Sequence, residues 1–214
     1  VCSSDLWQWK AGGAGVSNTA GSITSTVSAN PTVGFSIVKV TLSGSAPFNF
    51  GHGLGTAPSM FIAKRQDGTS PLNWHVYHKS MAASPQNGRL LLNLTDAYTV
   101  DAGAFGSTAP TSTVIYLGNN FSASTNVILY CWAEVTGYSK FGSYTGNGST
   151  DGPFVYCGFR PRWIMVKRYD AGTEHWNIFD TSRSSYNQAK DLLYANLSNA
   201  EASASAIDFL SNGF

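Results

Sequence analysis

The sequence predicts an all-β protein made of two tandem antiparallel units of the β-sandwich or jelly-roll kind, with the second unit truncated. Charged residues make up only 12% of the 214 residues, against about 25% in a typical globular domain. Short runs of β-branched and aromatic residues alternate with turns rich in Gly, Ser, Thr and Asn, which favours strands over long helices. An internal repeat then divides the chain into two copies of one unit.

The repeat is clearest in two segments that align without a gap and share their Pro, Lys and Arg, 57–65 and 160–168, with an offset of 103 positions from Pro58 to Pro161. So many matches in one order are hard to obtain by chance. Three further pairs of segments follow in the same order: residues 74–78 with 176–180, 93–97 with 196–200, and 116–121 with 209–214.

The repeat sets the domain boundaries. Residues 34–136 form the first copy and residues 137–214 form the second copy. The first copy closes with an apolar run over residues 127–135, which has no counterpart in the second copy. We therefore predict that the second copy lacks its last strand and exposes an unpaired sheet edge.

Within the first copy, alternation and turn residues predict about six or seven strands. A hairpin turn at Asp67-Gly68 joins two of them. The strands are expected over residues 34–41, 60–64, 74–77, 89–94, 113–117 and 126–135.

The second copy repeats this hairpin. Strands are expected over residues 163–167 and 176–179, around a turn at residues 170–172. Residues 186–193 and 200–204 are each expected to hold a turn of helix.

The first 33 residues, 1–33, differ from both copies. Residues 22–28 alternate like a strand, so residues 7–33 are expected to be a strand leading into the first copy or the end of a preceding unit. A flexible linker is the alternative. Residues 1–6 back-translate as GTG TGC TCT TCC GAT CT, which resembles the end of a common sequencing-library adapter. We expect these six residues to be an artefact of a translated metagenomic fragment.

Charge and cysteine content exclude several classes of protein. The net charge is +1 with no basic run, which disfavours a nucleic-acid partner. No stretch approaches the roughly 18 apolar residues of a membrane span. Cys131 and Cys157 lie inside apolar strand-like runs and are predicted to be buried free thiols, with no His at the spacing of a zinc site.

Candidate catalytic residues have simpler structural interpretations. His52 stands in a Gly-rich run and has no counterpart in the second copy, so we expect it to cap backbone groups in a turn. Most acidic residues sit in turns, where Asp serves the backbone. Glu134, at a strand end, has no visible partner for glycoside hydrolysis. The sequence therefore predicts no enzyme, no cofactor and no metal site.

Aromatic side chains beside polar ones form the one candidate binding site. Strand alternation places Trp74 and His78 on one face and His75 and Tyr77 on the other, so the two His cannot share a metal. Packing within the sheet is the main interpretation, and a platform for stacking sugars is the alternative. The candidate glycan-binding residues are Trp74, His75, Tyr77, His78, Trp176 and Asn177.

Several phrases in the sequence resemble one known family. The family is a domain of unknown function found in tail-fibre and other structural proteins of marine phages, often downstream of a concanavalin-like lectin domain. The resemblance covers residues 9–214, implies a virion context and carries no catalytic assignment. The phrases are GFSIV at residues 34–38, GHGLGTAP at 51–58, WHVYH at 74–78, LNLT at 92–95, YSKFGSYTGNG at 138–148, GPFV at 152–155 and IDFLSNGF at 207–214.

Residues and resemblance together predict a non-catalytic structural or adhesive module of a phage tail fibre or similar virion protein, extracellular once the virion is released. A carbohydrate-binding module that recognises host surface glycans is the alternative, and a glycan depolymerase ranks third. The expected partners are other tail proteins, with a host glycan for the alternative and with neither nucleic acid nor a membrane span. The full-length fibre is expected to bring copies together as a homo-oligomer, although this segment shows no heptads.

Overall fold

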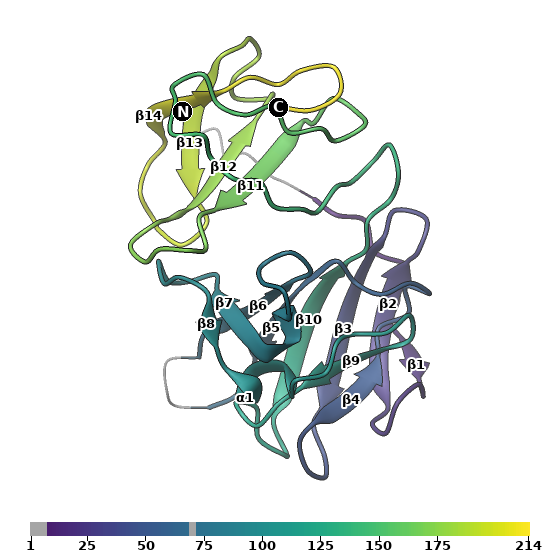
Figure 1. Cartoon of the computed structure of the whole chain (residues 1–214). Helices are drawn as coiled ribbons and strands as arrows, with labels where there is room; N and C mark the ends of the chain where they lie inside the picture. The colour runs from purple at the N-terminus through teal and green to yellow at the C-terminus, as the bar shows by residue number, and fades with distance from the viewer. Residues whose placement is uncertain (1–7, 69–71) are drawn as a thin grey trace.

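The computed structural model describes residues 8–68 and 72–214, and these confirm the all-β prediction. Within them lie fourteen strands, one α-helix of a single turn and one short 3₁₀ turn. The strands form two separate groups in space, β1–β10 in one and β11–β14 in the other (Figure 1). The adapter prediction for residues 1–6 falls outside the described residues. The more specific description as a sandwich or jelly roll stays a prediction.

An eight-stranded sheet, here called the first sheet, dominates the N-terminal part of the chain. Residues 16–18 and 25–30 belong to it, because β1 pairs with β2, and β2 pairs with β3 from Thr26 opposite Lys39 to Asn30 opposite Phe35. This fits a strand leading into the first copy and contradicts a flexible linker there. In spatial order the strands are β1 (Val16–Asn18), β2 (Ser25–Asn30), β3 (Phe35–Thr41), β10 (Asn126–Trp132), β5 (Met60–Arg65), β6 (Trp74–His78), β7 (Gly88–Leu91) and β8 (Thr99–Val100).

The main core lies on one face of the first sheet. A two-stranded sheet of β4 (Phe48–Gly51) and β9 (Val114–Leu117) covers this face together with α1 (Ala102–Phe105) (Figure 1). Because successive side chains of a strand point to opposite faces, every second residue of these strands points into this layer. Its fully buried members include Phe50, Phe61, Phe105, Ile115, Leu117 and Leu129. The sequence did not predict α1 or the 3₁₀ turn at Pro85–Asn87.

A four-stranded sheet, here called the second sheet, follows. Its strands run in chain order as β11 (Trp163–Lys167), β12 (Trp176–Asp180), β13 (Ala189–Tyr194) and β14 (Ala202–Ile207). The predicted helical turns at residues 186–193 and 200–204 are therefore wrong. Helix propensity is a weak preference that tertiary contacts override. Here the side chains of Ala189 and Leu192 enter the core beneath the sheet, where they pack with Phe209.

The two hairpins that the repeat predicts share one register. Lys64 lies opposite Trp74 in the first sheet, and Lys167 lies opposite Trp176 in the second. The next strands agree as well. Val76 faces Leu90 across β6 and β7, and Ile178 faces Leu193 across β12 and β13, at the offsets seen in the sequence.

The two copies differ on the outer side of that hairpin. In the first sheet β10 lies between β3 and β5. In the second sheet β11 is an edge strand, and no counterpart of β10 lies beside it in the described part of the chain. Residues 137–158, which match β3 and β4 of the first copy, form only isolated bridges such as Tyr156 with Gly213.

The two sheets contact each other directly. The side chain of Trp176 joins the core of the first sheet, and Met165 and Tyr169 pack against it. The backbone N–H of Tyr98 donates to the Tyr169 carbonyl oxygen at 2.8 Å. Strand β12 therefore contributes to both cores and ties the halves together.

Candidate functional site

The six candidate glycan-binding residues lie on two matching strands in different sheets. Trp74, His75, Tyr77 and His78 belong to β6, between β5 and β7. Trp176 and Asn177 begin β12, between β11 and β13. The alternation of a strand distributes these side chains over both faces of each sheet. The structure therefore does not gather them into one continuous surface.

Each of the two strands begins with a tryptophan whose backbone is held in the same way. The N–H of Trp74 donates to Oδ1 of Asn93 at 2.9 Å, and the N–H of Trp176 donates to Oδ1 of Asn196 at 3.0 Å. Asn93 and Asn196 are matching residues of the repeat. What the copies share at this position is therefore an acceptor for a strand N–H.

Trp176 is a core residue. Its side chain is only 4% exposed, and its Nε1–H donates to the Leu91 carbonyl oxygen of the first sheet at 3.0 Å. A buried indole normally places its N–H on such a partner. The ring face is covered by protein and is not offered to a ligand.

Trp74 is half-buried, and a cation lies over its ring. The Lys64 ammonium lies 5.3 Å from the ring centroid, and Lys64 also donates to the carbonyl oxygen of Leu72. A cation at this distance stabilises the ring electrostatically. The same ammonium occupies space that a stacked sugar would need.

Tyr77 also belongs to a core. Its ring stacks on Phe61 at 4.9 Å and meets Phe105 edge-on at 5.7 Å. Burial raises the pKa of Tyr77, so its hydroxyl stays protonated. Tyr77 therefore packs the first sheet against α1.

His75 lies on the same side of β6, with its ring 5.0 Å from that of Phe121. Burial, with the nearby positive charge of Arg89, lowers the pKa of His75 to about 4. The imidazole is therefore neutral at neutral pH. Among the described residues, its Nδ1 has no hydrogen-bond partner.

His78 caps the turn after β6. Its Nδ1 accepts a hydrogen bond from the Ser80 N–H at 3.1 Å, and burial, with the nearby Lys79 charge, lowers its pKa to about 4. In the second copy Asp180 takes this position, and its Oδ1 accepts from the Ser182 N–H at 2.9 Å. The residue type changes between copies while the backbone bond persists.

His52 is fully buried and also serves the backbone. Its Nδ1 accepts from the Leu54 N–H at 3.3 Å, which leaves Nε2 to donate to the Thr111 carbonyl oxygen at 3.2 Å. Burial lowers the pKa of His52. The predicted capping role is confirmed.

Glu134, the candidate carboxylate for hydrolysis, is held in two ion pairs. Glu134 bonds Lys79 at 2.6 Å and Lys140 at 2.9 Å. Burial alone would raise the pKa of Glu134, but the bonds from these two lysines lower it to about 2. Such a group stays ionised and is a poor proton donor at neutral pH.

Arg183 joins two further carboxylates, bonding Asp180 at 2.7 Å and Glu201 at 3.1 Å. Burial alone would raise the pKa of Asp180, but the backbone N–H and side chain of Arg183 lower it. The Asp180 side chain is almost completely enclosed, and therefore does not face a cleft.

The described His, Cys, Asp and Glu side chains do not form a metal site, and the thiols of Cys131 and Cys157 differ in burial. In the part of the chain that the structure describes, no three His, Cys, Asp or Glu side chains come close enough to hold a metal ion. Cys131 is buried as predicted, and burial raises its pKa to about 12. Cys157 is only half-buried, because residues 153–157 run along the surface beside the C-terminal residues. No helix among the described residues has the length and apolar character to cross a membrane.

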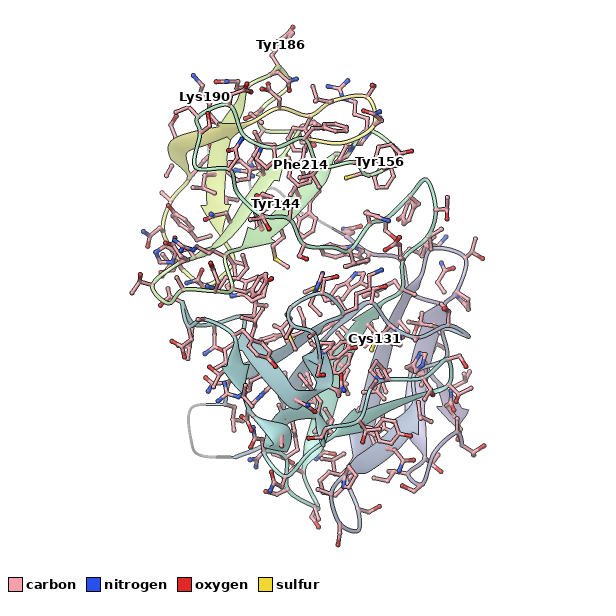
Figure 2. The ribbon with its side chains drawn as sticks, in the orientation of Figure 1. Cys131, Tyr144, Tyr156, Tyr186, Lys190 and Phe214 are labelled. Carbon is pink, nitrogen blue, oxygen red and sulfur yellow. The ribbon has the colours of Figure 1, made fainter. Side chains whose placement is uncertain are left out.

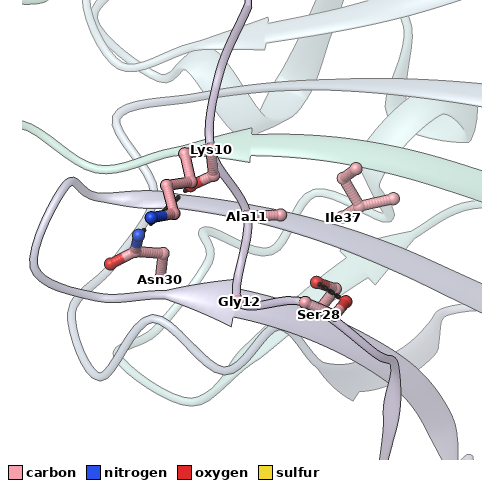
Figure 3. Close-up of a pocket in the computed structure, with 7 residues that line it drawn as sticks. Lys10, Ala11, Gly12, Ser28, Asn30 and Ile37 are labelled. Carbon is pink, nitrogen blue, oxygen red and sulfur yellow. Dashed lines mark hydrogen bonds between the residues drawn. The ribbon is translucent and has the colours of Figure 1, made fainter.

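A shallow surface groove of about 650 Å³ lies beside β2 and β3 (Figure 3). Asn30 Nδ2 donates to the Lys10 carbonyl oxygen at 3.3 Å, and Ser28 Oγ donates to that of Gly13 at 2.6 Å. The groove contains no aromatic ring and one charged side chain, so it offers little to a sugar or an anion. Its lining residues are Lys10, Ala11, Gly12, Gly13, Ser28, Asn30 and Ile37.

The sequence prediction missed a set of exposed aromatic residues in the second copy. Phe154 is 54% exposed and Tyr156 is 64% exposed, and because they are two residues apart on an extended segment they share a face. Nearby, the ring of Tyr144 meets that of Phe214 edge-on at 5.9 Å (Figure 2). The repeat offered a signal for this set. Residues 137–158 match β3 and β4, which are paired strands in the first copy, yet they contain no strand themselves.

Comparisons with known proteins add one finding. Residues 4–214 match the model of a domain of unknown function (DUF7483). No curated protein matches the chain, and no solved structure matches it.

Proposed function

The chain belongs to the DUF7483 family of domains of unknown function, and from this premise we propose that it is a non-catalytic structural module of a phage tail fibre or a similar virion protein. In this role the module serves as a rigid spacer or adhesive element of the fibre. Its partners are then other tail proteins, and its location is the virion.

One observation carries the structural part of the proposal. The residues that recur in both copies hold the backbone or fill a core, and they do not converge on a shared opening. Asn93 and Asn196 each bind the first N–H of a strand. His78 and Asp180 each cap the following turn. Selection for a scaffold preserves such positions, whereas a catalytic pair requires a particular residue type in a particular protonation state.

The state of the charged groups supports the same conclusion. The carboxylate oxygens of Glu134 form ion pairs with Lys79 and Lys140, and those of Asp180 with Arg183. Both carboxyl groups have lowered pKa values, whereas a general acid needs a raised one. These groups stabilise the fold, and their protonation states are unsuited to hydrolysis.

The virion context is supported by the resemblance of the sequence to tail-fibre domains of marine phages. Sequencing outward from this reading frame in its source DNA tests it directly. We expect baseplate and tail genes on either side. A neighbourhood of metabolic genes without virion genes would overturn the virion part of the proposal.

A carbohydrate-binding module is the second candidate, favoured by the exposed rings of Phe154 and Tyr156. Two aromatic rings on one face suit the apolar faces of sugars. A glycan array with the wild-type chain and a Phe154→Ala/Tyr156→Ala double variant tests it, with Tyr186→Ala as the control because Tyr186 is 85% exposed in the loop between β12 and β13 (Figure 2). Binding that the double variant loses and the control keeps would replace the scaffold proposal by the lectin one.

A further inference from the structure

We propose that Asn147 is a site of spontaneous deamidation, in which water converts its side-chain amide to a carboxylate through a cyclic succinimide. The sequence contains three Asn-Gly pairs, at residues 87–88, 147–148 and 212–213. A glycine after the asparagine favours the reaction, because it has no Cβ to obstruct ring closure. The structure distinguishes the three pairs. This site goes beyond the proposed scaffold role and does not depend on the virion context.

The reaction closes a five-membered ring. The backbone nitrogen of Gly148 attacks Cγ of Asn147, the bond from Cγ to Nδ2 breaks, and ammonia leaves with the proton that the Gly148 nitrogen gives up. Solvent water then opens the ring at either carbonyl carbon, which yields aspartate or its isomer isoaspartate. Nothing is oxidised or reduced. For the ring to close, the peptide group between the two residues must rotate until its nitrogen faces Cγ.

The peptide group between Asn147 and Gly148 is free to rotate. Among the described residues, neither the Asn147 carbonyl oxygen nor the Gly148 N–H has a hydrogen-bond partner. Gly148 has a φ of +71°, and a Cβ there would meet nothing within 4 Å. Residues 142–152 are exposed throughout, so water reaches the amide. The surrounding structure therefore opposes neither the rotation nor the hydrolysis.

The Asn147 side chain is oriented for the attack. Its Oδ1 accepts a hydrogen bond from the Ser149 N–H at 3.0 Å, which folds the side chain back along the two residues that follow it. Negative charge develops on this oxygen as the ring closes, and a backbone N–H directed at such an oxygen stabilises the transition state. Nδ2, the leaving nitrogen, donates to the Asp151 carbonyl oxygen at 2.8 Å. These contacts hold the amide without fixing the peptide group that must rotate.

The peptide group between Asn87 and Gly88 is fixed by hydrogen bonds at both of its polar atoms. The Asn87 carbonyl oxygen accepts from the Asp101 N–H at 2.8 Å, and the Gly88 N–H donates to the Pro85 carbonyl oxygen. Gly88 is also buried and begins β7, which pairs with β8. Rotation would break both hydrogen bonds and disturb this pairing.

The peptide group between Asn212 and Gly213 is fixed at its carbonyl oxygen. This oxygen accepts hydrogen bonds from the N–H groups of Cys157 at 2.8 Å and Gly158 at 3.1 Å. A Cβ at Gly213 would collide with the Val155 carbonyl oxygen, so the backbone is closely enclosed. The folded structure therefore protects two of the three pairs and leaves the third open.

Deamidation would change the charge of the loop that holds Asn147. Replacing the amide by a carboxylate lowers the formal net charge of the chain from +1 to zero. Both products lose the Nδ2 donor and with it the hydrogen bond to Asp151. The change stays outside the strands, since no strand contains Asn147.

Peptide mapping by mass spectrometry during incubation in mildly alkaline buffer tests the site, with the same chain unfolded in urea as the matched control. We expect the Asn147 peptide to deamidate in the folded chain at nearly its rate in urea. The Asn87 and Asn212 peptides should react about tenfold more slowly than in urea, or slower still, because each must first break two hydrogen bonds. Part of the product should be isoaspartate, detected with an isoaspartyl methyltransferase, because direct hydrolysis of the amide does not form it.

Three outcomes would overturn the proposal: earlier deamidation at Asn87 or Asn212 in the folded chain, protection of Asn147 equal to theirs, or a product without isoaspartate. Two variants then test the ring closure. We expect Gly148→Ala to slow deamidation several-fold and Gly146→Ala, one residue before Asn147, to leave it unchanged. Both glycines lie in open space in the exposed loop, and thermal unfolding confirms that the variants fold. Equal rates in the two variants would show that the Gly148 nitrogen does not close the ring.

Discussion

His78 and Asp180 occupy matching positions but differ in chemistry, and both accept a hydrogen bond from the N–H two residues on. At the residue scale the repeat therefore preserves hydrogen-bond acceptors for the backbone and not the residue types that supply them. Asn93 and Asn196 follow the same rule at the start of β6 and β12. A hydrogen bond of this kind contributes about 0.5–1.5 kcal/mol to stability, which is a reason to retain these positions without any role in ligand binding.

The two histidines of β6 make stability depend on pH. Burial lowers the pKa values of His75 and His78 to about 4 in the folded protein, from about 6.5 in an exposed imidazole. Between these values the unfolded chain binds more protons than the folded one, so the free energy of unfolding falls as pH drops from about 6.5 towards 4. Urea unfolding at about pH 7 and pH 4.5 measures the loss.

The double variant His75→Asn/His78→Asp gives the first copy the residues of the second, Asn177 and Asp180. It keeps the cap on Ser80 and removes both imidazoles. We expect the loss of stability between the two pH values to shrink clearly. If the loss of stability between the two pH values is unchanged, titratable groups other than these two histidines cause it.

At the scale of elements, one hairpin is built twice with little sequence identity. Both versions place a lysine opposite the first tryptophan of the return strand. In each, the lysine ammonium bonds a loop carbonyl oxygen, from Lys64 to Leu72 and from Lys167 to Glu174. The register is fixed because a shift by one residue would turn every apolar side chain to the opposite face.

Matching glycines test what β10 adds to the first copy. Gly34 and Gly137 both have positive φ, at +68° and +76°. A Cβ at Gly34 would collide with the carbonyl oxygen of Ala133 just past β10, whereas one at Gly137 would meet nothing within 4 Å. We expect Gly137→Ala to cost about 1 kcal/mol from backbone strain and Gly34→Ala about 3 kcal/mol or more. Thermal unfolding followed by circular dichroism compares them, and equal costs would contradict this assignment.

At the scale of the whole molecule, the second sheet depends on the first. Its own core contains few buried apolar side chains, among them Ile164, Phe179 and Phe209. Trp176 reaches into the main core instead and bonds Leu91. Small cores supply little stability by themselves, so contact with the first sheet supplies part of what holds the second sheet folded.

Limited proteolysis tests this dependence. Residues 142–152 are exposed throughout and contain no strand, so we expect a nonspecific protease to cut there before it cuts either sheet. The two fragments should separate on a denaturing gel and elute together on gel filtration, because the contacts of Trp176 survive the cut. Elution of the C-terminal fragment on its own would show that the sheets are independent.

The sequence determined the all-β class, the positions of most strands of the first copy and the matching hairpins of the repeat. It also determined that His52 is a cap. These features follow from local signals, since alternation, turn residues and repeated spacing act within a few residues along the chain. The strands at Ala189–Tyr194 and Ala202–Ile207 were mistaken for helical turns, because their strand pairing and their contacts decide what their composition leaves open.

Only the tertiary structure decided which aromatic side chains are available to a ligand. Trp74, Tyr77 and Trp176 stand out in the sequence, yet Tyr77 and Trp176 fill cores. Phe154 and Tyr156 are exposed, although the backbone of their segment bonds the C-terminal residues, with the Val155 N–H donating to the Phe214 carbonyl oxygen at 2.7 Å. Burial depends on which segments pair, and paired strands can lie far apart in the sequence, as β5 at Ile62 and β10 at Tyr130 do, 68 positions apart. Such long-range pairing leaves no local trace in the sequence.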